Sequence, residues 1–269
     1  MRSTHIKYYI IITIVALAIA SCTKVIDLKL GNNTGQLVIE GNVTDSGDFI
    51  VNLTRNVPFT STNTYPPVTG ATVTITDDHG DNLNLTEKQS GTYTFPKFFG
   101  VFGVSGRTYN LSVQTNGSTY TATSTMPQKV QMDSITANNS QFTSKDKQKG
   151  ITVYFQDPVD QVNQYRFIMY VNGVQVKNIF AYNDDFTNGR YVSFQLIEND
   201  IKIFSGDTVK VEMQCIDKPI YTYWYTLMQQ QGDDPGGGVA PSNPPTNITP
   251  ATLGYFSAHT VQDLTLVVK

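Results

Sequence analysis

The most constraining feature of the sequence is a series of short segments in which apolar and polar residues alternate. Residues 71–76, Ala-Thr-Val-Thr-Ile-Thr, are the cleanest example, because the aliphatic side chains fall on one face and the threonines on the other. A period of two is typical of a half-buried β-strand. Asn116-Gly117 and Asn172-Gly173 separate such segments, and this dipeptide favours two-residue hairpin turns. The pattern therefore predicts an all-β fold.

We expect two β-rich domains. Seven strand segments within residues 37–127 suit an immunoglobulin-like or transthyretin-like sandwich. Residues 128–269 continue in strands, interrupted by a Gly/Pro-rich loop at 232–250 and ending in two segments at 253–258 and 264–268. The apolar faces predict a core for the first domain formed by Val38, Val51, Leu53, Val73, Ile75, Tyr93, Leu111 and Val113.

One short helix is expected over residues 221–228 of the second domain. Helical spacing places Tyr221, Trp224 and Met228 on one face, and Pro219 suits a first helical turn. A strand would instead place Tyr221, Tyr223 and Tyr225 on one face. We favour the helix.

Residues 1–21 have the parts of an export signal, with a positive start followed by an apolar run of 13 residues. The run is shorter than the roughly 20 residues that span a bilayer as a helix. Ile19-Ala20-Ser21-Cys22 resembles the bacterial lipoprotein signal, which implies cleavage before Cys22 and acylation of that cysteine. Residues 22–36 would then be a tether. The alternatives are an ordinary secretory signal with a chance cysteine, or a buried N-terminal helix.

Charge and cysteine content narrow the function classes. The net charge is −3, and removal of residues 1–21, which hold two basic and no acidic residues, makes it −5. Such a chain lacks the basic character of a nucleic-acid-binding protein. Cys215 is the only other cysteine, so no internal disulfide is expected in the processed chain. It alternates in register with apolar Val209, Val211 and Met213, which indicates a core position.

Residues 77–82, Asp-Asp-His-Gly-Asp-Asn, are the densest group of oxygen ligands. Asp77, Asp78 and Asp81 are therefore candidate calcium ligands. The segment lacks the spacing and terminal glutamate of an EF-hand, and it lies between two expected strands, where these residues are ordinary turn formers. We favour the turn and predict neither a metal nor a cofactor.

The sequence gives little support for catalysis. His79 and His259 are the only histidines after residue 21, and neither has a nearby Cys, His or Glu at the spacing of a metal site. Residues 103–106, Gly-Val-Ser-Gly, miss the nucleophile-elbow pattern by one residue, and no phosphate-binding or dinucleotide motif is present. We predict that the protein is not an enzyme.

Two aromatic segments leave alternatives open. Residues 95–102 and 221–228 are rich in Phe, or in Tyr and Trp. If buried, they fill the end of a sandwich or the joint between the domains; if exposed, they suit a protein or glycan partner. We favour burial for both.

Several motifs together resemble one family. They are residues 22–28, 37–45, 66–73, 106–109, 120–127 and 253–258. The chain is similar to a Bacteroidetes family of outer-membrane lipoproteins built on a domain of unknown function, DUF4249, whose members tend to occur beside TonB-dependent receptors. The resemblance implies a role in nutrient uptake and supplies no catalytic residues. Asp133-Ser134-Ile135 and Asp207-Thr208-Val209 also resemble the pattern on which this phylum attaches O-glycans, so Ser134 and Thr208 are candidate glycosylation sites.

The expected function is that of a non-catalytic lipoprotein, held in the outer membrane through acylated Cys22 and assisting a TonB-dependent receptor. The alternative is a stand-alone adhesin that binds glycans or surfaces. Surface lipoproteins of this phylum tend to carry an acidic pair soon after the lipidated cysteine, whereas here Lys24 is followed only by Asp27. The side of the membrane is left open, with the periplasmic side slightly favoured.

Overall fold

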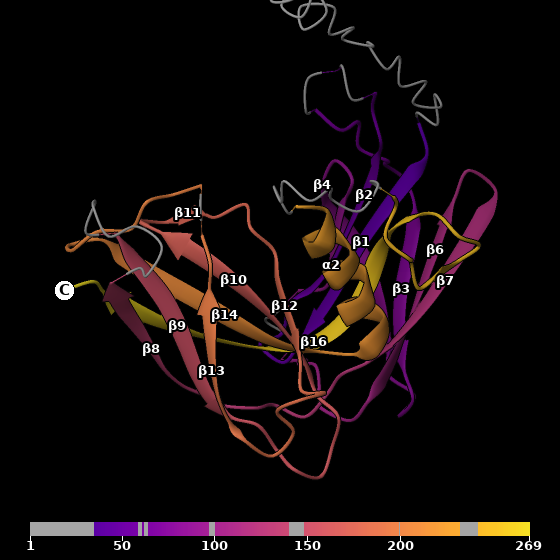
Figure 1. Cartoon of the computed structure of the whole chain (residues 1–269). Helices are drawn as coiled ribbons and strands as arrows, with labels where there is room; N and C mark the ends of the chain where they lie inside the picture. Colours follow the sequence, from indigo (N-terminus) through magenta and orange to yellow (C-terminus); the bar gives the residue numbers. More distant parts are fainter. Residues whose placement is uncertain are drawn as a thin grey trace, which may run out of the picture. The chain divides into compact units, whose positions relative to one another are not determined.

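Strands make up most of the described chain, which confirms the all-β prediction (Figure 1). The computed structural model describes residues 35–58, 61, 64–96, 100–139, 148–198, 200–231 and 242–269. The seven strands of the first part are β1 (Leu37–Thr44), β2 (Phe49–Arg55), β3 (Thr72–Asp77), β4 (Asn82–Gln89), β5 (Thr92–Thr94), β6 (Thr108–Thr115) and β7 (Ser118–Thr125). Asn116 and Asn172 both adopt the positive φ of 50° that the predicted Asn-Gly turns require.

The second part continues with strands and one described helix. Its elements are β8 (Met132–Asn139), β9 (Lys149–Gln156), β10 (Gln164–Val171), β11 (Val174–Gln175), β12 (Phe180–Asn183), β13 (Tyr191–Leu196), β14 (Thr208–Ile216), α2 (Lys218–Gln230), β15 (Ile248–Thr249) and β16 (Leu253–Val267).

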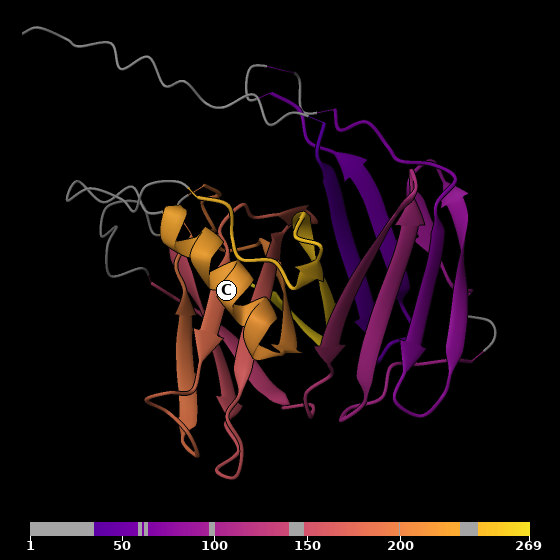
Figure 2. The ribbon, with the colours of Figure 1, turned by 90° about the vertical axis from the view of Figure 1, so that its right-hand side faces the viewer.

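The helix α2 confirms the helical interpretation and is longer than predicted. It begins where it does because Asp217 is the N-cap, with a carboxylate oxygen accepting the Ile220 N–H at 3.2 Å, and because Pro219 fits the first turn. The other carboxylate oxygen of Asp217 accepts the Ser124 hydroxyl at 2.7 Å, which ties the start of the helix to β7. Figure 2 shows α2 lying against the strands of the second part.

Thirteen strands belong to one hydrogen-bonded sheet system. Its order is β11-β10-β14-β16-β1-β2-β5-β4-β3-β6-β7-β15, with β12 also paired to β10, and a separate sheet has the order β13-β9-β8. The last strand, β16, connects the two parts, because it pairs in parallel with β1 and antiparallel with β14. Gly254 permits this close pairing: its φ is +98°, and a Cβ there would overlap the carbonyl oxygen of Ile39.

The prediction of two final strands, at 253–258 and 264–268, was wrong, since β16 is continuous over 15 residues. Its residues from Gly254 to Thr260 are all buried, and beyond them the strand becomes partly or fully exposed at most positions. The first stretch is covered on both faces, as the backbone of a central strand must be when it lies inside a domain. Alternation of apolar and polar residues identifies only half-buried strands, so it does not show that one strand continues from a fully buried stretch into an exposed one.

Two large hydrophobic cores follow the two parts of the sequence, and a third, small cluster consists of Ile216, Ile220 and Tyr255. The first joins the layer of β1, β2 and β5 to that of β3, β6 and β7, and it also takes in Ile248, Phe256 and Ala258 from the end of the chain. Residues 37–127 therefore do not close this sandwich without help from β15 and β16. Seven of the eight predicted core residues are buried, but Val38 is not: Leu37, Ile39 and Val43 form the buried face of β1, and Val38 lies on the other face.

No helix within the described stretches has both the length and the apolar character needed to cross a membrane.

Candidate functional site

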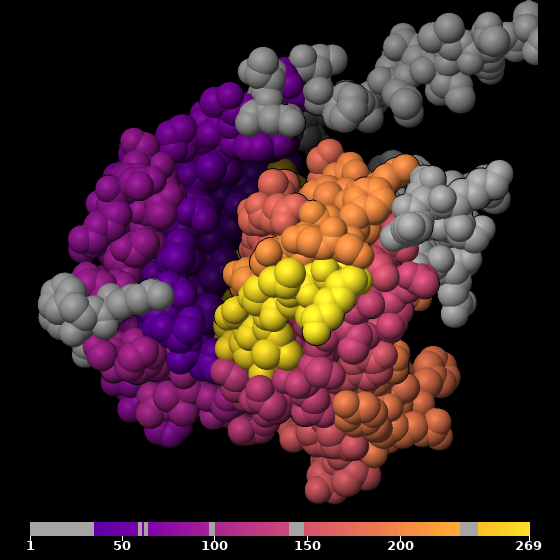
Figure 3. All heavy atoms as spheres, turned by 90° about the vertical axis from the view of Figure 1, so that its left-hand side faces the viewer, coloured from indigo at the N-terminus to yellow at the C-terminus, as the bar shows by residue number. Residues whose placement is uncertain are grey.

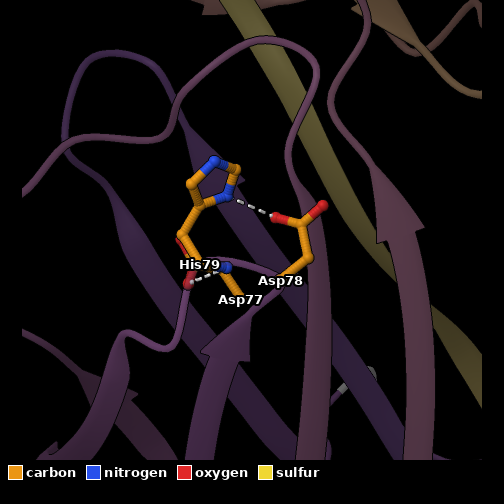
Figure 4. A group of neighbouring side chains, drawn as sticks. All are labelled: Asp77, Asp78 and His79. Carbon is orange, nitrogen blue, oxygen red and sulfur yellow. Dashed lines mark hydrogen bonds and ion pairs between the residues drawn. The ribbon is translucent and has the colours of Figure 1, made fainter.

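The acidic turn between β3 and β4 is well ordered by its own carboxylate. One oxygen of Asp77, Oδ1, accepts the N–H groups of His79 at 3.0 Å and Asp81 at 2.8 Å. Figure 4 shows Asp77, Asp78 and His79 close together, with His79 Nδ1 at 2.9 Å from Asp78 Oδ1. Ligand atoms of these three residues lie within 4.8 Å of one another, so the structure does bring a small acidic cluster together.

Arg107, which the sequence analysis missed, supplies the positive charge at this turn. Its guanidinium lies 2.7 Å from Asp77 Oδ2 and 2.9 Å from Asp81 Oδ2. Burial opposes ionisation of Asp77, but hydrogen bonds from the Asp81 amide and from Arg107 outweigh it and hold the pKa of Asp77 below its usual value. Two of the three candidate calcium ligands thus share the single positive charge of Arg107, which favours the interpretation as a structural turn.

The two histidines lie in contrasting surroundings. His79 is exposed on the acidic turn, whereas His259 is buried in β16 with Nδ1 3.0 Å from the Ser257 hydroxyl, which is buried too. Burial, together with the charge of Arg166, lowers the pKa of His259 to about 4. This imidazole is neutral at pH 7 and has no exposed face for a substrate.

The remaining predicted residues are placed as follows. Cys215 is a buried free thiol, which confirms its core position, and burial raises its pKa. Ser134 and Thr208 are both exposed near the starts of their strands, β8 and β14. Nothing in the structure tests their glycosylation. Cys22, the signal segment and the tether as far as residue 34 lie outside the described residues, as does most of the loop at 232–250.

The aromatic segments are divided between packing and exposure. Phe95 packs on the first core, while Phe102 is exposed and residues 97–99 lie outside the described chain. On α2, Tyr223 and Trp224 pack against Tyr255 with ring centroids 5.0 and 5.2 Å apart. The guanidinium of Arg166 lies 3.4 Å from the Trp224 ring centre, a cation–π contact that fixes the helix on the sheet.

Buried aspartates also hold two neighbouring loops, at residues 157–163 and 184–190, in the second part of the chain. Asp157 accepts the hydroxyl of Tyr165 and the N–H of Gly189, the latter at 3.1 Å. Asp184 accepts the N–H of Asn163 at 2.8 Å, and its own N–H donates to the carbonyl of Asn163 at 3.2 Å. The two connections, β9–β10 and β12–β13, are therefore fastened to each other.

These fastened loops expose apolar side chains at their ends. Phe186 is 89% exposed, Val162 69% and Val159 68%. We call these three residues the apolar tip. Local sequence patterns do not predict the apolar tip, because it is formed by two loops that are more than 20 residues apart along the chain.

The architecture defines an all-β protein with two fused cores, one long shared strand and a covering helix. A family model for a domain of unknown function, DUF4249, matches residues 23–265. The chain therefore belongs to this family, which confirms the family resemblance of its motifs. A search of curated proteins found no match.

Proposed function

We propose that this protein is a non-catalytic lipoprotein, anchored through Cys22 in the outer membrane, that assists a TonB-dependent nutrient receptor. The observation that carries the proposal is the position of Cys22. It follows small residues and an apolar run, and the family-matched region begins at the very next residue. Cleavage before Cys22 would leave the entire family domain attached to the acylated cysteine, and several acyl chains give stable anchoring where one would be marginal.

The polar clusters of the fold support a binding role over a catalytic one. Asp77 and Arg107 neutralise each other at a turn, and His259 is buried as a neutral imidazole. Both arrangements stabilise the fold through satisfied hydrogen bonds. Because these polar clusters serve the fold, we infer that the protein acts through contacts at its surface, as an accessory subunit does.

Acylation and fractionation test the anchor. Cells producing wild type, Cys22→Ala or Cys215→Ala are fed an alkyne analogue of palmitate, and outer membranes are washed with high salt. We expect wild type and Cys215→Ala to be labelled and to sediment, and Cys22→Ala to lose the label and leave the membrane fraction. A Cys22→Ala protein that still sediments would refute the anchor.

Isolation of the labelled protein in mild detergent tests the accessory role. We expect the receptor encoded beside its gene to be recovered with wild type. Recovery of no receptor, together with retained binding to cell-surface glycan, would favour the adhesin. Protease treatment of intact cells then decides the side of the membrane: a protected chain lies in the periplasm, and a cleaved chain lies at the surface.

A further inference from the structure

The apolar tip is held in place before any partner binds. Its two loops share the buried carboxylates of Asp157 and Asp184, and Gln156 Nε2 adds a hydrogen bond to the Gly189 carbonyl at 3.2 Å. A Cβ at Gly189 would lie only 3.0 Å from the Val159 side chain, so the loops are in direct contact. Loops fixed in this way lose little conformational freedom on binding, which is the usual condition for a specific docking surface.

The exposure of the tip is unusual for residues of this kind. Single exposed aliphatic residues are common on protein surfaces, but here a nearly fully exposed phenylalanine and two exposed valines lie on two loops that are fastened to each other. All residues of both loops are described, and no described element covers them. Figure 3 shows chain of the corresponding colours projecting at the lower edge of the second part. Grouped apolar residues with a polar surround mark interaction sites.

Charge around the tip selects among possible partners. The two loops contain four aspartates and one arginine, and Asp160 and Asp185 are exposed beside the apolar side chains. A second copy of the same tip would bring like charges together, and a phosphate-bearing lipid surface would repel these aspartates. A protein surface with an apolar socket edged by lysine or arginine complements both features.

The tip also lies away from the point where the chain enters the fold. Figures 1 and 2 show the loops after β9 and β12 at the end of the molecule opposite the start of β1.

We propose that Phe186, Val159 and Val162 form a docking surface that inserts into an apolar socket edged by basic side chains on a protein partner. This inference rests on the proposed function for the identity of the partner, which is the TonB-dependent receptor.

The test measures binding of purified, acylated full-length protein in detergent to the purified receptor encoded beside its gene. The tip variant is Phe186→Ser with Val162→Ser. The matched control is Val174→Ser with Val267→Ser, which replaces two side chains of 60% and 59% exposure near the other end of β10. All four positions are exposed, and the melting temperature of each variant verifies its fold. We expect the tip variant to bind at least tenfold more weakly and the control to stay within twofold of wild type.

A charge variant sharpens the result. Asp160→Lys with Asp185→Lys should weaken binding and reverse its salt dependence, because salt screens the attraction of wild type to a basic rim and the repulsion of the variant from it. Equal binding by wild type and the tip variant would overturn the docking surface and leave the proposed function standing. Failure of wild type to bind the receptor would overturn the proposed function and this inference with it. Tip-dependent dimers in sedimentation, or tip-dependent flotation of the Cys22→Ala chain with phospholipid vesicles, would each assign the tip to a different occupant.

Discussion

In the acidic turn at residues 77–82 and in the loops that carry the apolar tip, aspartates fix the backbone in the same way, but only the tip also presents apolar side chains to solvent. In both, an aspartate carboxylate accepts backbone N–H groups and fixes a connection between strands. At the turn the carboxylate of Asp77 also binds Arg107, and the exposed residues are polar. At the tip the carboxylates are likewise buried, and Phe186, Val159 and Val162 are exposed among polar residues that include Asp160 and Asp185. A group of aspartates thus identifies a fixed loop, and the side chains that the loop presents decide whether it is suited to binding.

The largest expected effect is on the buried aspartates of the tip. Asp157→Ala leaves the hydroxyl of Tyr165 and the N–H of Gly189 without their acceptor, and Asp157 is only 1% exposed. Each unsatisfied buried donor costs about 1–3 kcal/mol, so we expect the free energy of unfolding to fall by about 2–4 kcal/mol. Urea titration measures this. Exposed Asp160→Ala is the control and should change stability by less than about 0.5 kcal/mol; equal losses in the two variants would show that Asp157 does not fasten the loops.

A smaller loss is expected at the acidic turn. Asp77→Ala removes the acceptor of two N–H groups and the partner of Arg107, but the turn borders solvent, and water replaces part of what is lost. We expect a loss of about 1–2 kcal/mol by the same titration, and little change for exposed Asp78→Ala. A loss above that of Asp157→Ala would reverse the comparison.

The contributions of Asp77 and Asp184 to the free energy of unfolding should change with pH in opposite directions. The pKa of Asp77 is lowered in the folded protein, so its contribution is present above the unfolded pKa, near 4, and is lost as pH falls through the folded pKa. Burial raises the pKa of Asp184, so the folded protein binds that proton more tightly and gains stability as pH falls through the raised value. Unfolding titrations from pH 7 to 3 should therefore show wild type losing its advantage over Asp77→Asn and gaining relative to Asp184→Asn. The same sign for both would contradict the assigned environments.

The smallest effect on stability is expected at the tip itself. Phe186 contributes almost no buried surface, so Phe186→Ser should change the free energy of unfolding by less than about 0.5 kcal/mol. A thermal melt beside wild type is sufficient. A loss above about 1 kcal/mol would mean that the ring packs against the protein in solution, and the docking surface would lose its main anchor.

The fold was predictable where the signal is local. Alternation located the strands, Asn116-Gly117 and Asn172-Gly173 marked two hairpins, and Pro219 marked the helix start. The register of β1 was misassigned at Val38 because Leu37, Val38 and Ile39 are all apolar, so alternation does not choose a face. The pairing of β1 with β16 joins residues more than 200 positions apart, and no local pattern encodes it.

The candidate site was likewise predictable only where its residues are close together in the sequence. The acidic run at 77–82 is visible in the sequence, but its partner Arg107 lies 30 residues from Asp77 and reaches it only after β3 and β6 pair. The apolar tip was not predictable, since a valine or phenylalanine in a loop is as compatible with burial as with exposure. Cys22 is the opposite case: its meaning lies in the residues immediately before it, and the sequence carries that prediction alone.

Photocrosslinking in intact cells compares the two loop regions most directly. A photoreactive phenylalanine analogue replaces either Phe186 or His79, both of which are exposed, in the full-length protein produced together with the TonB-dependent receptor that we propose as its partner. After illumination, we expect a covalent product with the receptor from position 186 and none from position 79. A receptor product from position 79 alone, or from neither position, would contradict it.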